Sequence, residues 1–155
     1  KQSVNSDPMT VVKMPIALIC TFLWIGFVCA ISFMEAWLKF RGPGIDLPLG
    51  LGIGRIVFNA LNKVEWAFAL VIIINFFWNS SEIQKWQNLY FVIPLILLLI
   101  QTFWLLPALD ARAELHIQRQ FVPSSNLHFY YVGMEVVKVV GLTIFGLTLF
   151  KNTTI

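Results

Sequence analysis

The sequence predicts an all-α protein, an integral membrane four-helix bundle, and three observations lead to this prediction. Of the 155 residues, 58% are hydrophobic and only 12% are charged, and the mean hydropathy is +0.77. A soluble domain carries roughly a quarter charged residues, so this chain lacks the polar surface that water requires. Four long apolar runs each approach the ~20 residues that cross a bilayer as a helix. Four strands could not close a barrel, so we expect helices.

The four spans are expected within a single transmembrane domain, at about residues 14–40, 53–78, 87–116 and 127–150. The first run begins just after Lys13 and is longer than the apolar segment of a signal peptide, so we interpret it as a span. The last span follows the sequence Pro123 to Asn126, which is typical of a turn with a helix N-cap.

An even number of spans places both termini and the second loop on one side of the membrane. The first connection, residues 41–54, is rich in Gly and Pro, and it lies on the other side with the third loop. That face carries Lys39, Arg41, Arg55, Arg112 and Arg119, against Lys1, Lys13, Lys85 and Lys151 opposite. The positive-inside rule therefore predicts cytoplasmic first and third loops. We interpret these basic residues as membrane anchors for a lipid bilayer partner and expect no nucleic acid binding.

The ionisable residues gather in one half of the predicted bundle. Counting back from the aromatic helix ends places Glu65 about seven residues, or ~10 Å, inside the face of the first and third loops. Glu135 and Lys138 come out at a similar depth. The opposite half offers only Asn75, Gln101 and Thr102 as polar residues. Because each ionised group inside a bilayer costs a few kcal/mol, these charges need internal partners.

Two helices each place their polar residues on a single face, at three- and four-residue steps. We therefore expect one pocket, open to the face of the first and third loops, that binds a small polar or amphipathic ligand or an ion. Near its mouth, the planar fork of Arg55 would suit a carboxylate or phosphate group. The residues predicted to line this pocket are Arg55, Asn62, Glu65, His128, Tyr131 and Glu135.

Two other interpretations of the same residues stay open. Glu65 and Lys138 could form a structural ion pair, in which case the chain is a structural membrane subunit, and Glu35 with Lys39 would be an ordinary pair on one helix. A metal site is disfavoured, because the Glu-x-x-His spacing of helical di-metal bundles is absent. His128 and Glu135 are also two turns apart, about 10 Å along the axis. No catalytic residue or resident cofactor can be assigned.

The stretch from Phe40 to Glu65 resembles the MAPEG superfamily of four-helix membrane proteins. The resemblance rests on Phe40-Arg41, on the sequence RGPGIDLP, and on Arg55, Asn62 and Glu65 at matching spacing, whereas Gly54 and Phe58 differ from the family pattern. It implies a glutathione-dependent transferase or isomerase, with glutathione as cofactor bound between the subunits of a homo-oligomer, a trimer.

The whole chain also looks like a family of four-span membrane proteins of unknown function. This second resemblance rests on Gly54 to Phe58, on Pro107 to Glu114, and on Leu127-His128. It supports four spans and implies no mechanism.

Overall fold

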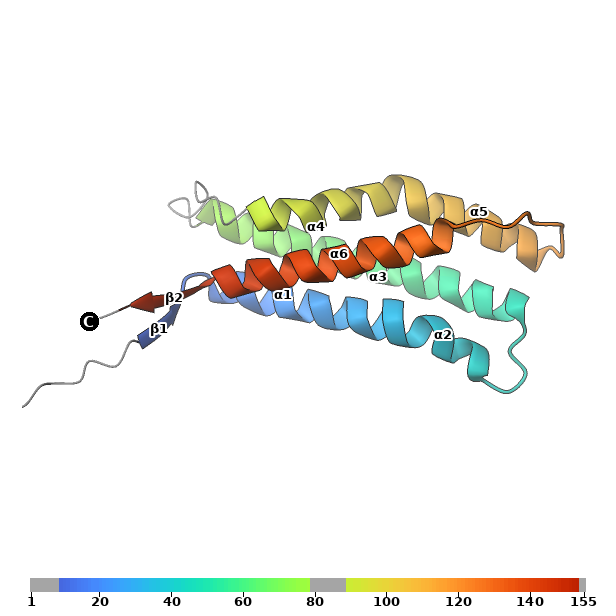
Figure 1. The fold of residues 1–155 in the computed structure, drawn as a ribbon, viewed down its shortest axis with the longest axis horizontal. Helices are drawn as coiled ribbons and strands as arrows, with labels where there is room; N and C mark the ends of the chain where they lie inside the picture. The colour runs from blue at the N-terminus through green and yellow to red at the C-terminus, as the bar shows by residue number, and fades with distance from the viewer. Residues whose placement is uncertain (1–8, 79–88, 154–155) are drawn as a thin grey trace, which may run out of the picture.

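Four helical spans run side by side along one axis in a computed structural model, which describes residues 9–78 and 89–153 (Figure 1). Each span is long and apolar enough to cross a membrane. The predicted all-α four-helix bundle is thereby confirmed, and the chain is a multi-pass integral membrane protein. The predicted second loop, 79–88, lies outside the described residues. The spans are Pro15–Arg41, Leu47–Trp78, Leu89–Ile117 and Leu127–Thr148.

The first span is one continuous helix whose winding changes along its length. It consists of α1 (Pro15–Val28), the π-helical segment η1 (Cys29–Glu35), α2 (Ala36–Leu38) and a final 3₁₀ turn, η2 (Lys39–Arg41). Pro15 stands at the first helical position, where its missing N–H costs no hydrogen bond.

The second span, α3 (Leu47–Trp78), begins six residues earlier than the sequence predicted. The expected Gly/Pro-rich loop is therefore wrong for residues 47–54, which are helical. Asp46 caps the helix, because its Oδ1 accepts a hydrogen bond from the backbone N–H of Leu49 at 2.9 Å. Gly50 is required by packing, since a Cβ there would lie 2.2 Å from Cε1 of Phe40.

The third span contains a second π-helical segment. It runs from α4 (Leu89–Ile100) through η5 (Gln101–Leu105) into α5 (Leu106–Ile117). Pro107 is the second residue after η5, has no N–H to donate, and would press its ring against the carbonyl of Phe103. A wider turn at this point relieves that conflict. The fourth span is α6 (Leu127–Thr148), in which Gly141 allows Pro94 to pack closely.

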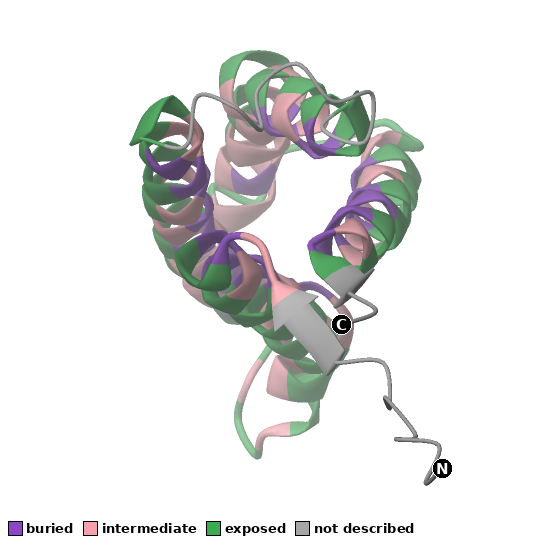
Figure 2. Cartoon of the chain, turned by 90° about the vertical axis from the view of Figure 1, so that its left-hand side faces the viewer, coloured by how far each residue is buried: buried purple, intermediate pink, exposed green. Residues whose placement is uncertain are grey.

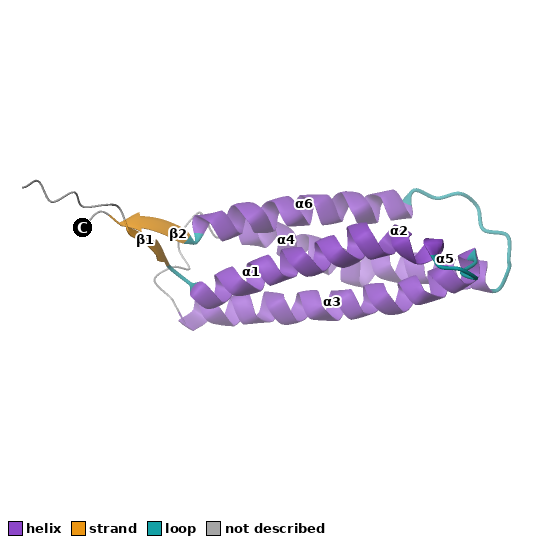
Figure 3. Cartoon of the chain, turned by 90° about the horizontal axis from the view of Figure 1, so that it is seen from below, coloured by secondary structure: helices purple, strands orange, loops and turns teal. Residues whose placement is uncertain are grey.

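A short antiparallel strand pair joins the two ends of the described chain. Strands β1 (Met9–Val12) and β2 (Phe150–Thr153) pair in the register Met9 with Thr153. The pair lies at the opposite end of the bundle from the connections between α2 and α3 and between α5 and α6 (Figure 3). The described ends of the chain therefore share one end of the molecule, as an even number of spans requires.

The outer surface of the bundle is apolar along its length, and buried residues face inward (Figure 2). Ile56, Phe77 and Phe103 are each about three-quarters exposed. Such a surface suits lipid and not water. Inside, the half nearer the strand pair is filled by packed aromatic side chains, with Phe91 and Phe145 5.2 Å apart between ring centroids.

Candidate functional site

A group of buried polar side chains, here called the central cluster, lies at the middle of the bundle. Lys138 stands eleven residues after the start of α6 and ten before its end. It is completely buried, as are the other members to within a few per cent. Each of the four spans contributes to the cluster, which consists of Trp24, Glu65, Gln101, Glu135 and Lys138.

The ammonium group of Lys138 uses all three of its protons within the cluster. It donates to Glu65 Oε1 at 2.6 Å and to Glu135 Oε1 at 3.2 Å, and it also donates to Gln101 Oε1. Because an ammonium has three donors and no acceptor, its hydrogen-bonding capacity is complete. The contact between Glu65 and Lys138 that the depth count predicted is therefore present.

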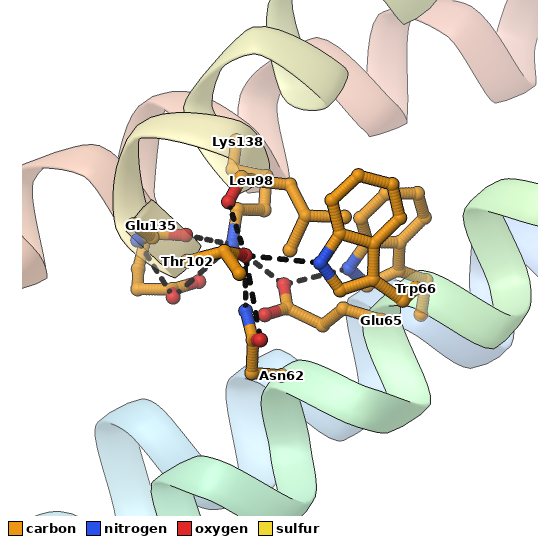
Figure 4. Close-up of polar contacts among 9 residues, drawn as sticks. Asn62, Glu65, Trp66, Leu98, Thr102, Glu135 and Lys138 are labelled. Carbon is orange, nitrogen blue, oxygen red and sulfur yellow. Dashed lines mark hydrogen bonds and ion pairs between the residues drawn. The ribbon is translucent and has the colours of Figure 1, made fainter. Parts of the chain in front are cut away.

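Two neutral side chains complete the cluster. Gln101 accepts from Lys138 through its oxygen and donates through Nε2 to Glu135 Oε1 at 3.0 Å. Trp24 donates its indole N–H to Glu65 Oε1 at 2.8 Å. Figure 4 shows Glu65 on α3 and the pair Glu135 and Lys138 on α6 pointing toward one another. Buried charges of this kind persist only with such dense hydrogen bonding.

One carboxylate oxygen of the cluster is left over. Among the described residues, neither Glu135 Oε2 nor the hydroxyl of Ser32 has a hydrogen-bond partner, although both atoms are buried. The hydroxyl of Tyr131 faces both groups, and its ring packs edge-on against Phe58 at 5.1 Å between centroids. These side chains extend the polar region from the cluster toward the η2 end of the bundle.

A smaller set of hydrogen bonds flanks the cluster on η5. The hydroxyl of Thr102 accepts from Asn62 Nδ2 and from the indole N–H of Trp66, each at 2.9 Å, and donates to the carbonyl of Leu98 at 2.7 Å (Figure 4). This oxygen therefore has its full set of hydrogen bonds, and the side chain of Asn62 links α3 to the third span.

A second group of charges, here called the outer triad, joins α3 to α5. Arg55 binds Asp110 with two parallel hydrogen bonds, of 2.5 Å from Nε and 2.9 Å from Nη2, and it binds Glu114 through Nη1. The side chains of Asp110 and Glu114 are 40% and 43% exposed, in contrast to the central cluster. The guanidinium is thus already engaged by two carboxylates of its own chain.

A cavity of about 130 Å³ lies beside the outer triad, between the η2 end of the first span and the facing helices. Most of its lining is apolar, and Lys39 enters it with its ammonium 5.0 Å from the ring centroid of Phe58. Lys39 also pairs with Glu35 at 3.2 Å, as expected for an i, i+4 pair. The lining includes Lys39, Phe40, Gly54, Arg55, Phe58, Leu109, Asp110 and His128.

The six residues predicted to line one pocket fall into two separate places. Arg55 and His128 line the cavity. Glu65 and Glu135 belong to the sealed central cluster, with Tyr131 beside it. Asn62 belongs to the set of hydrogen bonds around Thr102 that flanks the cluster. The ring pair of Phe58 and Tyr131 lies between the cavity and the cluster.

Sequence reasoning missed three members of this region. Gln101 was assigned to the apolar half, yet η5 brings it to the cluster, because the third span extends further toward the loop end than its apolar run. Trp24 and Ser32 gave no sequence signal of their own. The one sequence signal for this cluster that was overlooked is the amide of Gln101 in an otherwise apolar helix.

The comparisons with known proteins leave the chain without a family assignment. No protein-family model matches the sequence, and no match was found among curated proteins or among solved structures. The three residues that carry the MAPEG resemblance, Arg55, Asn62 and Glu65, all contact partners within the same chain. Glutathione-dependent activity and a trimer stay predictions.

Proposed function

We propose that this membrane protein binds a small amphipathic ligand in the cavity beside the outer triad. The observation that carries the proposal is an apolar cavity with charged side chains at its edge. Its volume of about 130 Å³ is close to the ~150 Å³ of apolar cavities that accept benzene-sized molecules. The ligand would place a short apolar group against Phe40, Phe58 and Leu109.

The polar head of the ligand would lie at the exposed edge of the cavity. The charged residues that line the cavity are Lys39, Arg55 and Asp110. Glu35 and Glu114 do not line it, but they contact Lys39 and Arg55 directly and so count in the local charge balance. Three carboxylates against two cations leave an excess of one negative charge, which favours a cationic head such as an amine. The engagement of Arg55 argues against the carboxylate or phosphate ligand expected from sequence.

The rest of the bundle supports binding in preference to conduction. Between the central cluster and the strand pair, the interior is packed with apolar and aromatic side chains such as Trp24, Phe91 and Phe145. A polar solute would find few partners there. In our proposal the positive-inside bias places the opening of the cavity on the cytoplasmic side.

Ligand-dependent thermal unfolding in lipid nanodiscs tests the proposal. We expect a short-chain alkylamine to raise Tm with a saturable dose dependence, because a ligand that binds only the folded state stabilises it. The carboxylate of the same chain length should raise Tm less. If neither compound shifts Tm at concentrations below those that perturb the lipid, the proposal is wrong.

Two glycines on α3 provide a matched control. Gly54 lines the cavity, and a Cβ there would lie 3.0 Å from Lys39 Nζ, whereas a Cβ at Gly52 would meet only Ile117, at 3.9 Å. Gly54→Val should abolish the amine-dependent shift by filling the cavity. Gly52→Val should retain it. Equal responses of the two variants would place binding elsewhere.

A further inference from the structure

The central cluster has an imbalance of charge. It contains two carboxylates, Glu65 and Glu135, and one ammonium, Lys138, so full ionisation would leave one net negative charge. All three side chains are at most 2% exposed. An uncompensated charge buried within a membrane bundle is strongly unfavourable, so something further neutralises the cluster.

A second observation concerns the carboxyl group of Glu135. Glu135 Oε2 is fully buried and accepts no well-formed hydrogen bond from the described residues, although the Tyr131 hydroxyl faces this carboxyl group, while Oε1 of the same carboxyl accepts two hydrogen bonds. Oε2 would gain a donor function if it carried a proton. The hydroxyl groups of Ser32 and Tyr131 lie nearby as possible acceptors.

We infer that the central cluster binds one proton, held between Glu135 and Glu65 around Lys138. One of the two carboxyl groups is then protonated, and the other is the ionised partner of Lys138. Two carboxyl groups that share one site commonly hold a proton in this way. The cluster then contains one ammonium, one carboxylate and one neutral carboxylic acid.

A metal cation is a poorer neutralising group here. Both carboxyl groups already face the ammonium of Lys138 through Oε1, so a cation on the remaining oxygen, Oε2 of Glu135, would share a carboxyl group with that ammonium. A second cation would have to sit beside that ammonium and would be repelled by it. In the described residues, no group of three His, Cys, Asp or Glu side chains is arranged to hold a metal ion.

The two carboxyl groups that share the proton differ in their surroundings. Glu65 accepts two donors at one oxygen, including the short contact of 2.6 Å with Lys138, which favours its charged form. Glu135 lies further from the ammonium, at 3.2 Å. The groups that face Glu135 are Ser32 from η1, Glu65 from α3, Gln101 from η5, and Tyr131 and Lys138 from α6.

Infrared difference spectroscopy of the reconstituted protein tests the inference, because only a protonated carboxyl gives a carboxylic acid C=O band. We expect such a band near neutral pH, shifted in D₂O and absent in Glu135→Gln. Glu65→Gln should also lose the band, because in each variant the remaining carboxyl group ionises and becomes the counterion of Lys138. Glu114→Gln, in the exposed outer triad, is the control and should leave the band unchanged.

Three results of this measurement would overturn the inference. Absence of the band in the unmodified protein, or its persistence in Glu135→Gln, would overturn the inference. So would persistence in Glu65→Gln, since the cluster would then carry a net positive charge. As a second measurement, replacing sodium by choline should leave Tm unchanged, and a sodium-specific rise in Tm without the band would mean that a metal cation neutralises the cluster.

Discussion

The outer triad and the central cluster contain the same kinds of ionisable group in different surroundings. Each has one cation between two carboxylates: Arg55 with Asp110 and Glu114, and Lys138 with Glu65 and Glu135. The outer carboxylates are 40% or more exposed, whereas the central ones are at most 2% exposed. The same charge count therefore has opposite consequences in the two places.

In the outer triad the excess negative charge can be hydrated or screened by salt, so no member depends strongly on another. In the central cluster no such screening is available, and each charge depends on its neighbours. Neutral side chains are also recruited there: Trp24 and Gln101 supply hydrogen bonds that water supplies at the outer triad. Burial, and not the number of charges, turns a set of ion pairs into a coupled unit.

The largest difference between the two regions should follow removal of the cation. Lys138→Met strands two buried carboxyls, and we expect a loss of about 3–5 kcal/mol in the free energy of unfolding. Arg55→Met should cost about 1 kcal/mol or less, because its partners are partly exposed. Reversible unfolding in mixed micelles measures both. Equal losses would mean that burial does not distinguish the regions.

A smaller difference is expected for the two glutamines that contact these charges. Gln101 bridges Lys138 and Glu135, whereas the exposed Gln118 donates to Glu114 Oε1 at 2.9 Å. Gln101→Leu should cost about 1–3 kcal/mol by leaving buried polar atoms unsatisfied. Gln118→Leu should stay within about 0.5 kcal/mol of the unmodified protein. A large effect at Gln118 would contradict the comparison.

The smallest expected effect is the salt dependence of each region. The Debye length falls from ~10 Å at 0.1 M to ~3 Å at 1 M salt. The cost of Arg55→Met should therefore shrink toward zero at high salt, while the cost of Lys138→Met should not change. Tm of the two variants, measured at both ionic strengths, tests this difference in salt dependence. If the cost of Lys138→Met falls in parallel with that of Arg55→Met, the cluster is accessible to ions.

The fold could be predicted because apolar run length is a property of the sequence alone. The four spans were expected within a few residues, except at the start of α3, where Asp46 caps a glycine-rich segment that is helical and the ring of Phe40 packs on Gly50. That outcome depends on a contact with the first span, which no local pattern contains. The strand pair β1–β2 was not predicted for the same reason.

The site was predicted less completely, for reasons of geometry. Matching depths were enough to bring Glu65 and Lys138 together. The rotation of the third span was not accessible, and it decides that Arg55 meets Asp110 and Glu114 while Gln101 enters the cluster. One pocket was expected because polar residues shared helix faces. Packing of Phe58 against Tyr131 divides that shared face in two.

The strand pair fixes an order of events during biosynthesis. Its first strand, Met9–Val12, is made before any span, and its second, Phe150–Thr153, is made after all four. Because each strand needs the other for its ladder of hydrogen bonds, β1 stays without its partner until β2 leaves the ribosome. Closing so long a loop adds little entropic cost beyond that of a shorter one. The pairing of β1 with β2 therefore requires that all four spans have already been made.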